Sequence, residues 1–129
     1  MGKYLGAVGI VTDDLEKASS FYSKTLGMVE LQTIDLPSMK EIIMGFEGSR
    51  SAALILMRYH DEQVAMRHNN AGKLVYYVND TSATIDKIRQ AGGQIEVEAT
   101  TSEQMSGAII GFARDLDGHQ LELIQKIKK

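Results

Sequence analysis

The pattern of hydrophobic and polar residues predicts the same run of elements in each half of the chain. In the first half, apolar positions indicate a strand at 4–11, and helical spacing of apolar residues predicts a helix over 14–25. Further strands are expected at about 28–36, 40–47 and 51–59. The second half repeats the order, with a strand at 73–78, a helix from Asn79 or Asp80 to Gly92-Gly93, and strands at about 94–99, 107–113 and 119–126. Each half is therefore expected to be a βαβββ module.

A shift of 66 positions brings the two halves into register without a gap. Under this shift Asp14 falls on Asp80, Gly27 on Gly93 and Gly45-Phe46 on Gly111-Phe112. The repeat predicts two related modules, 4–59 and 73–126, joined by a polar linker at 60–72, within a single domain of residues 1–129. It also predicts which residues of the two modules occupy equivalent places.

Composition narrows the range of functions. The net charge is −3 and no basic stripe is present, which argues against a nucleic-acid partner. The chain has no cysteine, so disulfides, thiolate ligands and cysteine nucleophiles are excluded. No apolar run approaches the ~18 residues of a membrane span, and the first residues lack the apolar core of a signal peptide. We therefore expect a cytoplasmic protein with neither a nucleic-acid nor a membrane partner.

Three segments resemble the vicinal oxygen chelate superfamily, which includes glyoxalase I and the bleomycin-resistance proteins. They are Val11-Thr-Asp-Asp-Leu-Glu-Lys-Ala-Ser-Ser-Phe-Tyr-Ser-Lys-Thr-Leu-Gly-Met28, Ile85-Asp-Lys-Ile-Arg-Gln-Ala-Gly-Gly93 and Asp115-Leu-Asp-Gly-His-Gln-Leu-Glu-Leu-Ile124. The resemblance implies an α+β fold of two βαβββ modules, forming a curved eight-stranded mixed sheet with a concave pocket. It also implies a homodimer. It does not fix the function, because one fold serves several chemistries.

Metal-dependent members of this superfamily are similar in using four ligands, one from the first and one from the last strand of each module. Motif matching and the repeat place these positions at Ala7, Leu56, Lys73 and Glu122. Only Glu122 could ligate a divalent cation, because alkyl groups lack lone pairs and an ammonium group donates only. We expect no metal and no other cofactor. The histidines His60, His68 and His119 and the turn carboxylates Asp115 and Asp117 are interpreted as solvated or turn-capping groups.

Strand alternation extends the predicted pocket beyond these four positions. Lys73 and Glu122 are expected to face inward on neighbouring strands as an ion pair. The same alternation adds ligand-binding candidates, which together with Ala7 and Leu56 are Leu54, Arg58, Tyr77 and Gln120.

Two functions are compatible with such a pocket, besides a purely structural or regulatory role with a vestigial pocket. In the first, the protein binds a small organic molecule without the usual metal, as a bleomycin-resistance-like protein does. In the second, it is a metal-independent isomerase, epimerase or lyase with Glu122 as base and Lys73 as electrostatic stabiliser. A metal-dependent lactoylglutathione lyase is a third option, disfavoured by the four residues above.

Overall fold

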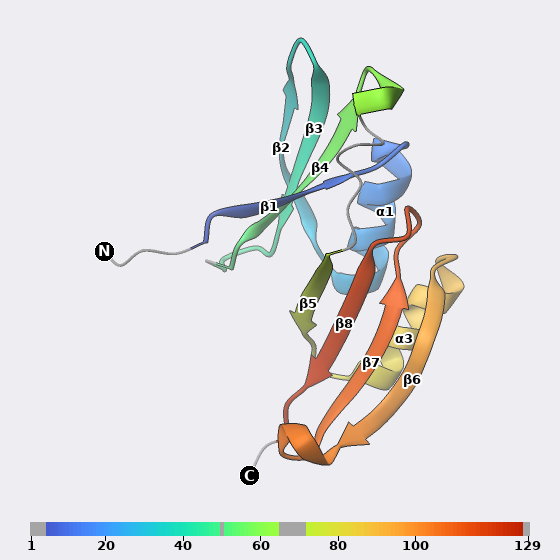
Figure 1. Ribbon diagram of the computed structural model, residues 1–129. Coiled ribbons are helices and arrows are strands. Elements are labelled where there is room, and N and C mark those ends of the chain that lie inside the picture. Colours follow the sequence, from blue (N-terminus) through green and yellow to red (C-terminus); the bar gives the residue numbers. More distant parts are fainter. Residues whose placement is uncertain (1–4, 50, 65–71, 128–129) are drawn as a thin grey trace. The chain divides into compact units, whose positions relative to one another are not determined.

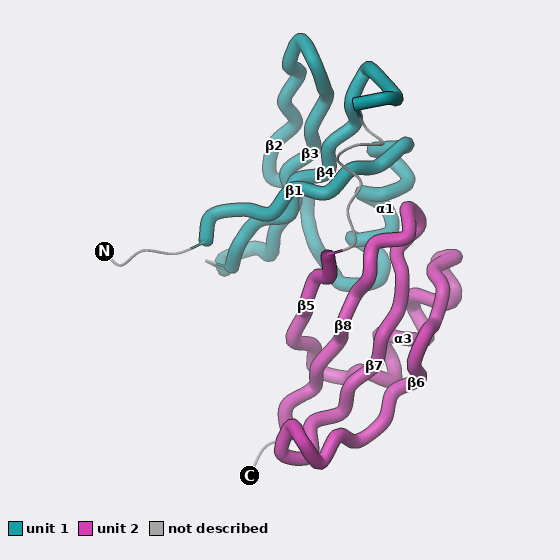
Figure 2. The backbone as a smooth tube through the Cα atoms, in the orientation of Figure 1, with its two compact units in different colours: residues 1–70 teal, residues 71–129 magenta. Residues whose placement is uncertain are grey.

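The computed structural model describes residues 5–49, 51–64 and 72–127, and the chain divides into two compact units, 1–70 and 71–129 (Figure 2). The first unit holds a four-stranded sheet in the order β1-β4-β3-β2. Its elements are β1 (Ala7–Val11), α1 (Leu15–Leu26), β2 (Val29–Asp35), β3 (Met39–Gly45) and β4 (Ala53–Tyr59). The sheet is mixed, since β1 pairs with β4 in parallel and the other neighbours are antiparallel.

The second unit repeats this topology, with the strand order β5-β8-β7-β6 and a parallel pair β5–β8 (Figure 1). Its elements are β5 (Lys73–Tyr77), α3 (Thr81–Gln90), β6 (Gln94–Ser102), the 3-10 turn Glu103–Met105, β7 (Ala108–Arg114) and β8 (Gln120–Gln125). The α+β fold of two βαβββ modules is thus confirmed. The eight strands of the described residues are divided between two four-stranded sheets.

Both main helices begin at an aspartate cap. The carboxylate of Asp14 accepts a hydrogen bond from the Lys17 amide at 3.1 Å, and that of Asp80 accepts one from the Ala83 amide at 3.0 Å. Such caps satisfy amide groups that have no partner within the helix. None of the helices in the described part of the chain is long and apolar enough to cross a membrane.

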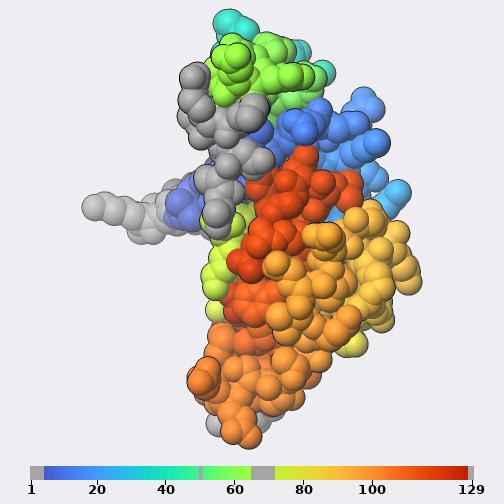
Figure 3. Space-filling model, turned by 45° about the vertical axis from the view of Figure 1, so that its right-hand side comes forward, coloured from blue at the N-terminus to red at the C-terminus, as the bar shows by residue number. Residues whose placement is uncertain are grey.

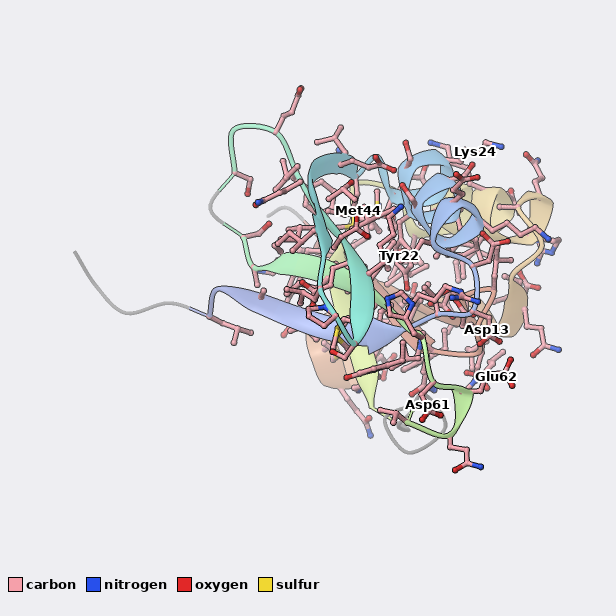
Figure 4. All side chains as sticks on the ribbon, turned by 90° about the horizontal axis from the view of Figure 1, so that it is seen from above. Asp13, Tyr22, Lys24, Met44, Asp61 and Glu62 are labelled. Atoms are coloured by element: carbon pink, nitrogen blue, oxygen red, sulfur yellow. The ribbon has the colours of Figure 1, made fainter. Side chains whose placement is uncertain are left out.

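Each helix covers one face of its own sheet. In the first module the fully buried Tyr22, Met44 and Leu56 form the core, and Figure 4 shows Tyr22 and Met44 between α1 and the strands. In the second module Ile85 and Ile88 of α3 are buried together with Leu121 and Leu123 of β8. Among the described residues, α1 and α3 each cover one face of their sheet and leave its opposite face uncovered.

The two modules differ in the register of their last strand. The Thr12 amide donates to the Met57 carbonyl, whereas the Val78 amide donates to the Ile124 carbonyl. Thr12 and Val78 are 66 positions apart, but Met57 and Ile124 are 67 apart. In the parallel strand pair of the first module, Ile55 lies opposite Gly9. In that of the second module, Glu122 lies opposite Val75, which is the repeat equivalent of Gly9. The first-module counterpart of Glu122 is therefore Ile55. The predicted counterpart, Leu56, is the next residue along the strand.

Close packing of α3 on its sheet makes Gly111 a testable position. A Cβ at Gly111 would lie 3.0 Å from Ile85 Cδ1 and 3.3 Å from Thr81 Cγ2. We expect Gly111→Ala to lower the free energy of unfolding by about 1–3 kcal/mol, because overpacking forces neighbours apart. Urea denaturation followed by circular dichroism measures the change.

Gly6→Ala is the matched control, because a Cβ at Gly6 meets nothing within 4 Å. It should change stability by less than about 0.5 kcal/mol. Equal losses in the two variants would show that α3 does not pack on Gly111 as described.

Candidate functional site

An ion pair lies on the face of the second sheet that α3 does not cover. Lys73 on β5 and Glu122 on β8 are diagonal neighbours, because Lys73 is opposite Gln120 and Glu122 is opposite Val75. Lys73 Nζ donates to Glu122 Oε1 at 2.7 Å. The Lys73 side chain is 49% exposed and that of Glu122 only 9%. The expected pair therefore forms, with a buried carboxylate and an ammonium group that solvent can reach.

Apolar side chains lie along one side of this pair. Phe112 on β7 lies opposite Glu122, and Lys73 Nζ is 5.8 Å from the centroid of its ring. Val75, the next residue of β5 on this face, is 45% exposed. Ile124, the next residue of β8 on this face after Glu122, is buried. In Figure 3, the orange-red to red surface of β7 and β8 lies between β5 (yellow-green) and β6 (orange). The result is a charged group beside an apolar surface, an arrangement that suits a small organic anion.

Gln120 shares the face of Lys73 but is held by a different partner. Its side-chain amide donates to Glu96 Oε1 at 3.2 Å, and Arg114 Nε donates to Glu96 Oε2 at 3.1 Å. These hydrogen bonds, that of Gln120 first, lower the pKa of the exposed Glu96 carboxyl. Gln120 is thus anchored toward β6, and the structure does not bring its amide to Glu122.

Tyr77 occupies the far end of the same row. It lies opposite Ile124 and is 64% exposed. The ammonium of Lys126 lies over its ring, 4.6 Å from the centroid. Sequence reasoning proposed Tyr77 but missed Lys126, which follows the last residue of β8. Continued strand alternation from Glu122 and Ile124 would have found it.

The first module does not arrange its predicted residues as expected. Leu54 lies opposite Met44, and Leu56 lies opposite Ile42. Met44 also lies opposite Glu30, whose carboxylate accepts a hydrogen bond from Ser19 of α1, so this face of the sheet is the one that α1 covers. Leu54 and Leu56 therefore face α1 and form the core, so their prediction as pocket residues is wrong. The prediction failed because the repeat was applied without the one-residue offset, and a one-residue shift exchanges the faces of a strand.

Ala7 and Arg58 lie apart from these core leucines. Ala7 is exposed and opposite Ala53, on the face that also carries Gly9 and Ile55. Arg58 is exposed, and its Nε donates to the Asp13 carbonyl at 3.0 Å, next to the start of α1. Alternation puts Arg58 on the same face of β4 as Leu56, so it does not join Ala7.

The turn before β8 holds a second group of polar residues. Asp115 Oδ1 accepts from the Asp117 amide at 2.9 Å and from the His119 amide at 2.8 Å, so this carboxylate caps the turn. Asp115, Asp117 and His119 have potential ligand atoms within 4.8 Å of one another. Burial, and then the charge of Asp115, raise the pKa of the neighbouring Tyr76. His60 is exposed, and His68 lies outside the described residues.

The positions at which the resemblance to the superfamily implies metal ligands hold few donor atoms in either module. The first module presents a methyl group at Ala7 and an alkyl group at Ile55. The second presents the Glu122 carboxylate, one of whose oxygens is already paired with the Lys73 ammonium. In each module, these positions therefore offer fewer oxygen or nitrogen ligands than a divalent cation requires.

Comparison with known proteins agrees with the fold. The family model described as the Glyoxalase/Bleomycin resistance protein/Dioxygenase superfamily matches residues 4–123. A lactoylglutathione lyase of Haemophilus influenzae is 33% identical over 115 residues, covering 87% of this chain and 84% of the relative. A probable lactoylglutathione lyase of Synechocystis is 33% identical over 120 residues, covering 90% of each.

Solved structures show the same architecture at lower identity. Glyoxalase I from Zea mays has a TM-score of 0.74 and 23% identity, with 94% of this chain and 44% of that chain covered. TnmS3, an antibiotic binding protein from Streptomyces, has a TM-score of 0.75 and 16% identity, with 97% of each chain covered. These two likenesses concern the fold alone. With the family model matching nearly its whole length, the chain belongs to the glyoxalase/bleomycin resistance protein/dioxygenase superfamily.

Proposed function

We propose that this protein binds a small organic anion at Lys73, on the uncovered face of the second sheet, without a divalent metal. The observation that carries the proposal is the Lys73 ammonium, paired at 2.7 Å with Glu122 at a position where the family resemblance implies a metal ligand. An ammonium group has three hydrogens to donate, and Glu122 accepts one of them. The half-exposed side chain can present the others to a carboxylate.

The surroundings of Lys73 support an organic rather than an inorganic anion. Val75 and Phe112 provide apolar surface beside the ammonium group, and Glu122 keeps that group in a fixed direction. A ligand with an acidic group and an apolar body would satisfy both features. A fixed charge also lowers the ordering cost of binding.

The names of the relatives supply the competing function, a lyase reaction. Glu122 would then act as general base and Lys73 would stabilise developing negative charge, the roles expected from the sequence. A purified sample that consumes lactoylglutathione, the compound after which those relatives are named, would favour this function over binding alone. Loss of that turnover in Glu122→Gln would assign the base.

Lys73→Met should weaken binding of small carboxylates about tenfold to a hundredfold, because a hydrogen bond to a charged group contributes roughly 1.5–3 kcal/mol. A thermal-shift screen of carboxylates against their neutral amides identifies a probe, and titration calorimetry measures Kd. Lys87→Met removes the same charge from an exposed position of α3 and should leave Kd unchanged. Binding that is equally tight in Lys73→Met would refute the proposal.

Affinity for the carboxylate probe should be the same before and after treatment with a chelator, because the donor set does not suit a divalent cation. Elemental analysis of the dialysed protein after exposure to Ni²⁺, Zn²⁺ or Mn²⁺ should find well under one ion per chain. One tightly held ion per chain, lost in Glu122→Gln, would overturn the metal-free part of the proposal.

The ion pair also makes a prediction for stability. Lys73→Met leaves the buried Glu122 carboxylate without its partner, and should lower the free energy of unfolding by about 1–2 kcal/mol. Adding Glu122→Met should recover part of this loss, giving a coupling of about 1 kcal/mol in a double-mutant cycle measured by urea denaturation. Additive losses in the double variant would mean that the pair is not formed in solution.

A further inference from the structure

A cleft of about 790 Å³ opens at the carboxyl end of the parallel pair β5–β8, away from Lys73. Its walls come from the end of β5, the end of β8 and the residues that follow each strand. The lining residues are Tyr77, Val78, Asn79, Ile124, Gln125, Lys126 and Ile127. The size is within the range of pockets that hold small molecules.

The described residues that line the cleft bring a positive charge and no carboxylate. Lys126 is the only permanently charged residue among the described lining residues, and it forms no ion pair with another described residue. Gln125 accepts a hydrogen bond from the Thr81 amide through its side-chain oxygen, at 2.9 Å. Its amide nitrogen is therefore left as a donor. The electrostatics of the cleft favour an anion.

The cleft also offers an aromatic surface. Tyr77 is 64% exposed and Ile127 is 45% exposed, so both present apolar atoms to solvent. The Lys126 ammonium lies over one face of the Tyr77 ring, 4.6 Å from its centroid, so the charge and the aromatic surface are in direct contact. A planar group packed against Tyr77 would therefore place an attached acidic group near Lys126.

We propose that this cleft is a second binding site, for a planar aromatic carboxylate. The ring of the ligand packs on Tyr77 and Ile127, and its carboxylate pairs with Lys126. The site goes beyond the proposed function at Lys73, because Lys73 and Tyr77 are four residues apart along β5, which corresponds to about 13 Å. Each site can therefore bind or fail to bind without the other.

The test uses 1-naphthoate as the probe and 1-naphthalenemethanol as its neutral counterpart. Titration of the isotope-labelled protein by NMR should show naphthoate shifting the amides of Tyr77, Asn79 and Lys126. Lys126→Met should weaken naphthoate binding about tenfold, and Tyr77→Ser should weaken it severalfold. Lys73→Met should leave these shifts unchanged, and Lys87→Met is the charge-matched control.

Other outcomes overturn the proposal. Equal affinity for the alcohol would show that charge does not direct binding, and unchanged affinity in Lys126→Met would remove the pairing partner. Naphthoate shifts that centre on Lys73 and Val75, and vanish in Lys73→Met, would support the site at Lys73 and refute a site in the cleft. Lys126 and Tyr77 are exposed, so both variants are expected to fold, which circular dichroism checks.

Discussion

The parallel pairing of the first and last strands of each module decides which side chains meet on its sheet. These two strands are distant in sequence, yet β1 lies beside β4 and β5 lies beside β8. Lys73 and Glu122, 49 residues apart in the chain, meet only through that pairing. The same pairing forms the walls of the cleft around Lys126. The capped helices and the antiparallel hairpins hold these pairs in place.

Local signals predicted the fold well. The left-handed Gly27 and the helical spacing are encoded by neighbouring residues, so both helices and the order of elements were predictable. The Lys73–Glu122 pair was also predictable, because alternation along β5 and β8 fixes one face in each strand. In this respect the second module matched its prediction from sequence.

Register was not predictable to the same degree. It depends on the length of the turns, and the repeat at 66 holds for β1 and β5 but not for β4 and β8. This single offset moved Leu54 and Leu56 from the expected pocket to the core against α1. Lys126 was not predicted as a site residue for another reason. It follows the last paired residue of β8, where strand pairing no longer enforces the alternation of faces.

The one-residue offset has a consequence for how such proteins can change. Alternation means that lengthening or shortening the turn before β4 or β8 by one residue replaces every side chain of that strand on a given face. Glu122 and its neighbours Leu121 and Leu123 would then exchange environments in one event, whereas substitutions would need to alter each position separately. The length of this turn thus determines which alternate set of side chains in the strand faces a ligand. A sequence alignment that leaves out a one-residue change in the turn will assign site residues to the hydrophobic core.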